Sequence, residues 1–228
     1  EEENAEWNEL MKSEGFTAKP QTQKDFERLL VASPDSSIIW IQYVAFFLAK
    51  KNSVKARGII KRALKEINVS MDKERLNIWI AWMNLEMLYG TQEALIDVFK
   101  QALRQNEKKD VYTQFIAVCR ENRKYDLCHK YFTEMLHKFR TDASVYANYG
   151  EFLYQQFANR LRTQFLDQAR DLLKRGIQNL PMKTQHVALI QKYAWHEYKY
   201  VNKVIASNDY RGADVKNEGE AMFEGLLK

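Results

Sequence analysis

The sequence feature that most constrains the fold is a pair of aromatic residues, three positions apart, that recurs along the chain. The copies are Trp40 and Tyr43, Trp79 and Trp82, Tyr112 and Phe115, Tyr146 and Tyr149, and a weaker fifth pair, Ile190 and Tyr193. The first members of the pairs are separated by 39, 33, 34 and 44 residues. Because residues three apart are neighbours on the surface of an α-helix, each pair marks one face of a helix.

A second pattern alternates with the first and marks another helix. It consists of a large apolar residue, two mostly polar residues, a small or apolar residue and an aliphatic residue. Its copies are Phe26–Leu30, Ile60–Leu64, Phe99–Leu103, Phe132–Leu136, Leu173–Ile177 and Phe223–Leu227. Two helix types that alternate at a period of roughly 34–40 residues are typical of stacked helical hairpins. We therefore predict an all-α, right-handed superhelical solenoid of about five repeats.

One hairpin of this kind cannot cover its own apolar residues. The stretch from Asn77 to Gly90 has apolar residues at nearly every position and almost no polar stripe, so it needs neighbours on both flanks. We predict that the rings of one repeat pack against small residues of the next. The predicted structural positions are Trp40, Tyr43, Trp79, Trp82, Tyr146, Tyr149, Tyr193, Ala63, Ala102 and Gly176.

The repeats define a domain over 22–228, and residues 1–21 form a separate segment that is acidic and then polar. This segment is either a linker or a short amphipathic cap that uses Trp7, Leu10 and Met11. A lengthened turn, formed by longer helices, is expected between Tyr154 and Ala169. A polar stretch over 199–219 is expected to be a flexible inserted loop.

The ends of the chain suggest a fragment of a longer protein. The first residue is Glu1 rather than Met, and the last copy of the second pattern reaches Leu227, one residue before the end. We therefore expect the repeat domain to be incomplete at its C-terminus. The oligomeric state is left open by the sequence.

The sequence shows no pattern that predicts catalysis, a cofactor or a metal site. No apolar run reaches the roughly 18 residues of a membrane helix, and no glycine-rich phosphate motif is present. The histidines, His129, His137, His186 and His196, lack metal-ligand spacing. Cys119 and Cys128 are nine residues apart and are expected to be reduced core thiols. We predict no enzyme activity and no small-molecule substrate; an enzyme with a hidden site is the remaining alternative.

Charge points to one candidate RNA-binding surface. The net charge is +5, and it is +10 for residues 15–228, because residues 1–14 hold six Glu and one Lys. Five basic residues of one predicted helix fall opposite its apolar arc: Lys55, Arg57, Lys61, Arg62 and Lys65. Such a face either binds phosphates without sequence preference or is an ordinary solvated face. A smaller cluster consists of Arg160, Arg162, Arg170, Lys174 and Arg175.

These patterns resemble the half-a-TPR (HAT) repeat of RNA-processing proteins. The segment from Ser53 to Leu64, SVKARGIIKRAL, is similar to the second half of that repeat, and the Trp-x-x-Tyr pair of Trp40 and Tyr43 is similar to the first. The resemblance implies a HAT/TPR-like solenoid that acts as a scaffold for protein–protein interaction.

Three segments resemble one family more closely: the C-terminal HAT-repeat region of the ribosomal RNA-processing protein 5 family, called programmed cell death protein 11 in animals. They are DFERLLVASPDSSIIWIQYVAF (25–46), ERLNIWIAWMNLEMLYG (74–90) and AMFEGLL (221–227). The resemblance implies a nucleolar factor with S1 domains before this region, whose linker ends in residues 1–14. It implies a role in pre-rRNA processing and small-subunit assembly, with ribosome-assembly proteins, pre-rRNA or snoRNPs as partners. The alternative is a HAT-repeat scaffold in mRNA splicing or 3′-end processing.

Overall fold

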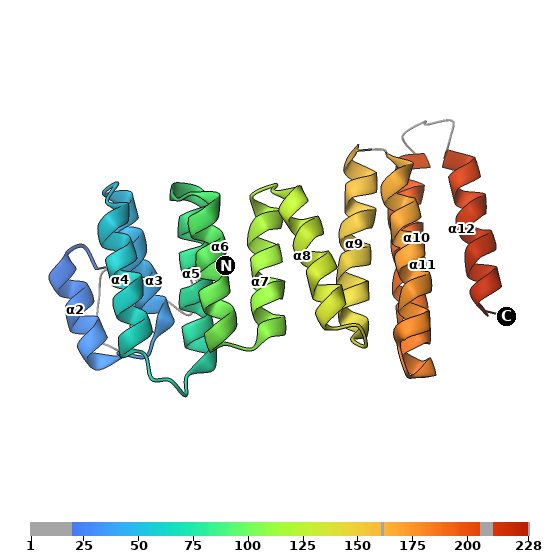
Figure 1. Cartoon of the computed structure of the whole chain (residues 1–228). Helices are drawn as coiled ribbons and strands as arrows, with labels where there is room; N and C mark the ends of the chain where they lie inside the picture. Colours follow the sequence, from blue (N-terminus) through green and yellow to red (C-terminus); the bar gives the residue numbers. More distant parts are fainter. Residues whose placement is uncertain (1–19, 161, 206–211, 228) are drawn as a thin grey trace. The chain divides into compact units, whose positions relative to one another are not determined.

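A computed structural model of the chain describes residues 20–160, 162–205 and 212–227 (Figure 1). All regular structure in these ranges is α-helical, which confirms the predicted all-α class. The helices are α2 (Gln23–Ala32), α3 (Ser37–Ala49), α4 (Ser53–Glu66), α5 (Asp72–Tyr89), α6 (Gln92–Gln105), α7 (Lys108–Glu121), α8 (Tyr125–Lys138), α9 (Ala143–Arg160), α10 (Thr163–Asn179), α11 (Lys183–Ile205) and α12 (Gly212–Leu227). The expected acidic segment over 1–14 lies outside the described residues.

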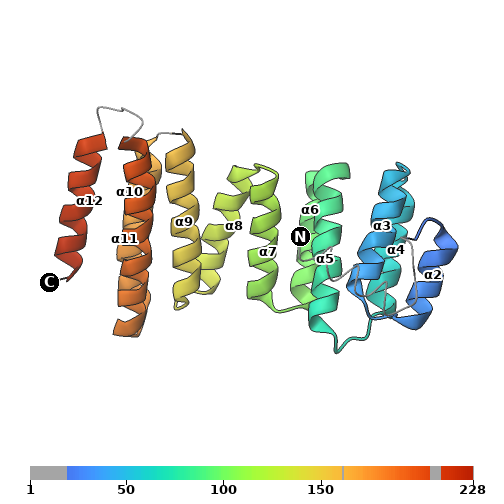
Figure 2. The same ribbon diagram turned by 180° about the vertical axis from the view of Figure 1, so that it is seen from behind.

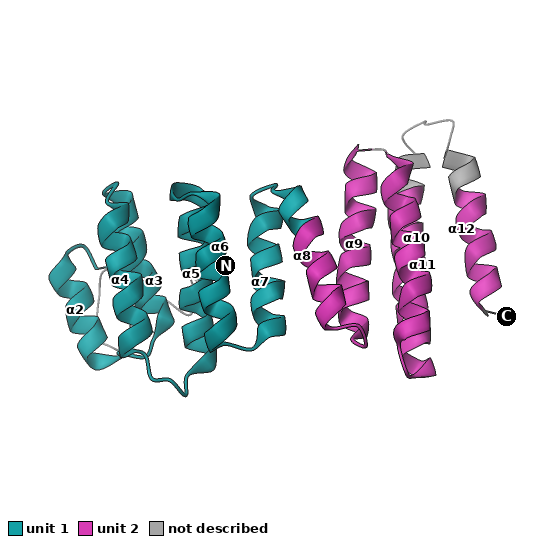
Figure 3. Ribbon diagram, in the orientation of Figure 1, with its two compact units in different colours: residues 1–128 teal, residues 129–228 magenta. Residues whose placement is uncertain are grey.

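The chain divides into two compact units, Glu1–Cys128 and His129–Lys228 (Figure 3). The boundary falls inside α8. In unit 1, α3 contacts α4 and α5 contacts α6, which gives two consecutive hairpins. The first helices of successive repeats also contact one another, α3 with α5 and α5 with α7, and form one layer (Figure 2). This is the contact pattern of a solenoid, in which each hairpin packs on the next one.

Side-chain caps fix where the helices of unit 1 begin. Thr22 accepts a hydrogen bond from the backbone N–H of Asp25, whose carboxylate accepts in return from the N–H of Thr22. Thr91 caps α6 in the same position. The cap of α4 is Asn52, because the Asn52 side chain accepts from the N–H of Lys55 and Ser53 is the first helical residue.

The core of unit 1 is built from the repeated rings. Trp79 and Trp82 stack with their ring centroids 5.4 Å apart and their planes inclined by 10°. Phe26 of α2 stacks on Tyr43 of α3 at 4.8 Å. The buried predicted positions of this unit are Trp40, Tyr43, Ala63, Trp79, Trp82 and Ala102. The buried residues of α5 span an arc of about 160° at 100° per residue, and Ile80, Ala81 and Asn84 outside this arc are partly buried.

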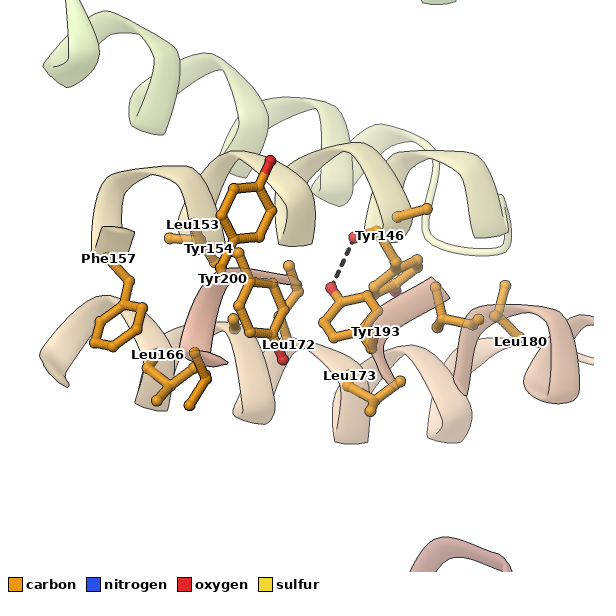
Figure 4. Close-up of a cluster of buried hydrophobic side chains, with 14 residues drawn as sticks. Tyr146, Leu153, Tyr154, Phe157, Leu166, Leu172, Leu173, Leu180, Tyr193 and Tyr200 are labelled. Atoms are coloured by element: carbon orange, nitrogen blue, oxygen red, sulfur yellow. Dashed lines mark hydrogen bonds between the residues drawn. The ribbon is translucent and has the colours of Figure 1, made fainter. Parts of the chain in front are cut away.

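The core of unit 2 lies between α9, α10 and α11 and contains the predicted rings of Tyr146 and Tyr193, which Figure 4 shows. Tyr146 and Tyr193 are buried, and the hydroxyl of Tyr193 donates a 2.7 Å hydrogen bond to the backbone carbonyl of Tyr146. Tyr149 is partly buried against this cluster. In the fifth pair the buried partner of Tyr193 is Leu189, while the predicted Ile190 is only partly buried.

Two glycines allow the helices of unit 2 to approach closely. A Cβ atom on Gly176 would lie 2.7 Å from Leu189 Cδ2 and 3.1 Å from Tyr146 Cδ1. A Cβ atom on Gly150 would lie 2.3 Å from the Cζ atom and from the hydroxyl oxygen of Tyr193. Real Cβ atoms do not tolerate such distances, so glycine at these positions sets the distance from α11 to α9 and α10.

The polar stretch near the C-terminus forms less loop than the sequence predicts. The expected loop covers 199–219, but α11 continues to Ile205 and α12 begins at Gly212. The helix continues because buried residues recur at helical spacing along α11, at Leu189, Tyr193 and Val201. Residues 199–205 and 212–219 of the expected loop are therefore helical, and the rest of it, with Asn208 and Asp209, lies outside the described residues. The lengthened turn near residue 160 is explained by long helices, because α9 ends at Arg160 and α10 begins at Thr163.

Both cysteines are buried in unit 1 as free thiols. Burial raises the pKa of Cys119 to about 12 and that of Cys128 to about 11, so neither thiol is ionised near neutral pH. In the described ranges, no helix is long and apolar enough to cross a bilayer.

The substitution Gly150→Ala tests the close approach of α9 and α11. We expect it to lower the free energy of unfolding by about 1–3 kcal/mol, the usual cost of overpacking, because the new methyl group overlaps the buried Tyr193 ring. Gly225→Ala in α12 is the matched control, since nothing lies within 4 Å of its Cβ position. The control should raise stability by about 0.5–1 kcal/mol. Urea denaturation measures both changes, and equal stability of the two variants would contradict the packing described.

Candidate interaction surfaces

The basic face predicted on α4 separates into paired arginines and exposed lysines. Arg57 donates two hydrogen bonds to Glu86 of α5, from Nε to Oε1 at 2.7 Å and from Nη2 to Oε2 at 2.8 Å. The Glu86 side chain is 5% exposed and also accepts from Trp82 Nε1 at 3.0 Å. These hydrogen bonds, led by the one from Arg57, lower the pKa of Glu86. Arg57 therefore joins α4 to α5 rather than presenting its charge to a ligand.

Arg62 has a similar role on the other flank of α4. Its Nη1 donates to both carboxylate oxygens of Glu27 in α2, at 2.8 and 2.9 Å, and its Nε donates to Glu66 at 2.7 Å. Its guanidinium lies 5.3 Å from the ring centroid of Trp40. Tyr43 donates to the same Glu27 carboxylate at 2.9 Å, and burial followed by this hydrogen bond raises the pKa of Tyr43. Arg62 thus connects α4 to α2 and to the ring layer of α3.

The other three predicted RNA-binding residues, Lys55, Lys61 and Lys65, are exposed. The ammonium groups of Lys55 and Lys61 lie 5.6 and 5.8 Å from the centroids of the Phe47 and Trp82 rings. Within the described residues, no salt bridge involves these lysines. The structure therefore leaves three accessible positive charges on this face, where the sequence predicts five.

A groove of about 450 Å³ lies across α3, α5 and α7 in unit 1. Its aliphatic lining comes from Ile38 and Ile41 of α3 and from Ile80 and Ala81 of α5. Four amide side chains complete it, together with Ser37: Gln42, Asn77, Asn84 and Gln114. No charged or aromatic side chain is among the lining residues, so the groove suits an uncharged occupant.

The amides of this groove are placed by helical spacing and one hydrogen bond. Asn77 and Asn84 are seven residues apart and lie on the same face of α5. Asn77 Nδ2 donates to Ser37 Oγ at 3.0 Å, and the Ser37 N–H donates to Glu74 at 2.8 Å. In the described part of the chain, the side-chain amides of Gln42, Asn84 and Gln114 form no hydrogen bond. Each of these amides has donors and an acceptor available for a ligand.

The second basic cluster of the sequence loses Arg170, which is buried, while its other four members are exposed. Arg170 is buried and binds Glu197 of α11 at 2.5 Å and Glu218 of α12 at 3.1 Å. The Tyr154 hydroxyl donates to the other oxygen of Glu197 at 2.5 Å. Charge alone groups Arg170 with Arg160, Arg162, Lys174 and Arg175, whereas helical phase separates it from them. Arg170 directly follows the buried Ala169, and this position in the helix indicates the burial that charge alone does not.

The histidines lie apart from one another in the described residues, where no cluster of potential metal ligands is found. His129 Nδ1 lies 3.2 Å from the Tyr149 hydroxyl, and His186 Nε2 lies 2.8 Å from the Leu180 carbonyl. These contacts are explained by the packing of the helices.

Sequence analysis also missed two exposed aromatic residues of α11, Trp195 and Tyr198. The buried stripe of α11 includes Leu189 and Tyr193, and Trp195 is rotated about 200° from Tyr193 at 100° per residue. The helical phase of this long helix is the signal that predicts their exposure.

A comparison with known proteins shows relatives over most of the chain. It is 36% identical over 208 residues to the "rRNA biogenesis protein rrp5" of Schizosaccharomyces pombe, covering 91% of this chain and 11% of the relative. It is 36% identical over 181 residues to the human "Protein RRP5 homolog", covering 79% of this chain and 9% of the relative. It is 30% identical over 211 residues to the Arabidopsis thaliana "rRNA biogenesis protein RRP5", covering 92% of this chain and 10% of the relative. The chain therefore spans about a tenth of the length of these relatives.

Two other comparisons add less. No known protein-family profile matches the chain. Among solved structures, a TPR protein named YrrB aligns over 86% of this chain and 91% of its own, with 15% identity and a TM-score of 0.35. A score at this level supports no inference, so the fold rests on the helices and contacts described above.

Replacing Arg57 tests whether this arginine is structural. We expect Arg57→Met to lower the free energy of unfolding at pH 7 by about 1–3 kcal/mol, because Glu86 stays buried without its main partner. The folded pKa of Glu86 is depressed, so the pair stabilises the protein above the unfolded value of about 4.3, and this contribution is lost as pH falls through the folded pKa. The difference between wild type and variant should therefore shrink on acidification in urea denaturation.

Lys61→Met is the matched control for that experiment, because Lys61 is an exposed lysine on the same helix. Its effect on the free energy of unfolding should stay within about 0.5 kcal/mol at both pH values. If Arg57→Met were equally mild at pH 7, the assignment of Arg57 as a structural tie between α4 and α5 would be wrong.

Proposed function

The chain belongs to the RRP5 family, and we propose that it is a non-catalytic scaffold module of a nucleolar ribosome-biogenesis factor. In this proposal the module binds assembly-factor proteins and contacts pre-rRNA during pre-rRNA processing and small-subunit assembly. The names of the relatives supply the process, rRNA biogenesis. The repeated hairpins supply the scaffold, because stacked hairpins present long surfaces for partners.

The observation that carries the protein-binding role is the uncharged groove across α3, α5 and α7. Amide side chains both donate and accept hydrogen bonds, so Gln42, Asn84 and Gln114 match the alternating N–H and C=O groups of an extended peptide. The aliphatic side chains of Ile38, Ile41 and Ile80 would hold an apolar side chain of that peptide. The lining contains no cation for a phosphate and no ring for a base, which favours a protein occupant over RNA.

A second observation favours contact with pre-rRNA. Lys55, Lys61 and Lys65 are exposed along α4, and no acidic residue occurs over 50–65. Exposed lysines bind phosphates by releasing counterions, without reading the sequence of the RNA. Such contacts would hold pre-rRNA near a protein partner bound in the groove.

Two groove variants test the protein-binding role. Ile80→Lys and Asn84→Asp each place a charge in the uncharged groove. We expect them to weaken partner binding by about 5- to 150-fold, because an unsatisfied buried polar group costs about 1–3 kcal/mol. The measurement is crosslinking of the tagged full-length protein in its own cells, followed by identification of crosslinked proteins and RNA.

Val31→Lys is the matched control for this experiment, because Val31 is exposed on α2, outside the groove and away from the lysines of α4. It should leave the crosslinked partners unchanged. If both groove variants kept every partner of the wild type, the groove would have no role in binding. Recovery of spliceosomal RNA or mRNA 3′-end factors, in place of pre-rRNA, would instead favour the alternative of a HAT scaffold in mRNA processing.

The RNA contact predicts a change in salt dependence. Combining Lys61→Glu with Lys65→Glu should weaken binding to a labelled single-stranded oligouridine. It should also reduce the slope of log K against log salt by about 1.4, since each lost phosphate contact of a single strand removes about 0.7. The double variant Lys73→Glu with Lys100→Glu makes the same charge change at exposed positions outside α4 and should keep the slope. Equal slopes for the two double variants would remove the RNA role from α4.

A further inference from the structure

Helix α11 exposes two large aromatic side chains next to each other. Trp195 is 60% exposed and Tyr198 is 65% exposed. Their ring centroids are 6.1 Å apart, and the ring planes are inclined by 29°. The two rings therefore stack on each other while both remain exposed to solvent. Large exposed apolar groups that lie together, unlike single ones, mark binding surfaces.

Lysines run beside these rings along the same helix. Lys192 and Lys199 are exposed, and they are seven residues apart, which places them on one line parallel to the aromatic residues. The acidic residue of α11 is Glu197, and it is buried and bound by Arg170 and Tyr154. The exposed face of α11 between 183 and 201 therefore combines positive charge with aromatic surface.

A pocket of about 490 Å³ between α9 and α11 lies beside Trp195. Its polar lining consists of Asn148 and Glu151 of α9 and Gln191, Lys192 and His196 of α11. Glu151 Oε1 accepts a hydrogen bond from Gln155 at 3.1 Å, and its second oxygen makes no hydrogen bond in the described residues. Burial lowers the pKa of His196, so its imidazole is neutral at neutral pH and has both a donor and an acceptor nitrogen.

We propose that this surface binds single-stranded RNA, with one base in the pocket, stacked on Trp195, and with phosphates along Lys192 and Lys199. Bases of single strands stack on aromatic side chains and are read by hydrogen bonds at their edges. The free oxygen of Glu151 accepts from an exocyclic amino group, so the pocket prefers an amino-bearing base such as cytosine. The site deepens the proposed function, on which it rests for the choice of RNA over DNA.

The lining of the pocket favours a base over a helix from a protein partner. A docked helix requires a continuous apolar groove for its anchor residues. Here most lining residues are polar, and the aromatic ring forms one wall beside two amides and a carboxylate. A flat base with polar edges fits this arrangement, and Lys192 at the pocket and Lys199 outside it match the charge of the RNA backbone.

The first test replaces Trp195 in the 228-residue chain and measures binding of a labelled oligocytidine by fluorescence anisotropy. Trp195→Ala should weaken binding roughly 5- to 150-fold, since stacking contributes about 1–3 kcal/mol per base. Trp195→Phe should keep most of the affinity, because it keeps a ring. Trp195→Leu keeps an apolar side chain without a ring and should behave like Trp195→Ala. If Trp195→Leu bound as well as Trp195→Phe, the surface would be an apolar docking site for protein instead.

The second test measures base preference. Wild type should bind oligocytidine more tightly than oligouridine by roughly 2- to 13-fold, the value of one hydrogen bond, and Glu151→Ala should remove this preference. Equal affinity of wild type for the two strands would overturn the assignment of the pocket. Oligodeoxycytidine is titrated in parallel, and tighter binding of the deoxy strand would point to single-stranded DNA and contradict the choice of RNA.

Two controls separate this site from the surfaces of unit 1. Tyr89→Ala removes an aromatic residue that is 56% exposed on α5 and should leave oligocytidine binding unchanged. The Lys61→Glu, Lys65→Glu variant should lower affinity for both strands while keeping the preference for cytidine. If RNA binding depended on α4 but not on Trp195, the inference would fail while the proposed function stood. If the groove variants lost no partner but Trp195→Ala lost RNA, the inference about α11 would stand and the protein-binding role of the groove would fail.

Discussion

The fold depends on the close packing of the first helix of each repeat against its neighbours. In unit 2 the ring of Tyr193 occupies the space that a side chain at position 150 would fill, and Leu189 and Tyr146 do the same at Gly176. The hydroxyl of Tyr193 then bonds to a backbone carbonyl of α9, which satisfies its polar atom inside the core. With this side of each helix buried, the opposite side of α3, α5 and α11 does not contribute to the core.

Three arginines tie neighbouring helices together, whereas the lysines of α4 stay exposed. Arg57, Arg62 and Arg170 each bind a carboxylate on a neighbouring helix, in contacts that use two or more of their N–H groups. The planar guanidinium suits such bonds and is more weakly hydrated than an ammonium group, so it is the better group for helix interfaces. Lysines are left at the surface. A count of basic residues on a helical face therefore overstates the charge that a nucleic acid would meet.

The repeat architecture could be predicted because the same sequence pattern recurs along the chain. The candidate sites could not, because the residues that form them do not follow that pattern. Rings at fixed spacing predict the buried positions from Trp40 to Tyr193, since every copy obeys the same packing constraint. The partner of an arginine is set by which residue of another helix faces it, as Glu86 faces Arg57, and no spacing within one helix contains that information. The loop over 199–219 was overestimated because polar residues were read as loop, whereas the buried stripe that includes Tyr193 and Val201 keeps α11 helical.

The open sides of the first helices carry different chemistry in the two units. In unit 1 the face of α5 presents Asn77, Ile80 and Asn84, which are small, uncharged and suited to a peptide backbone. In unit 2 the corresponding face of α11 presents Lys192, Trp195 and Tyr198, which are large, aromatic and cationic. The core positions on the buried sides are alike in both units, so packing does not require this difference. Since neither face contributes to the core, the side chains on each face can differ without disturbing the packing of the helices.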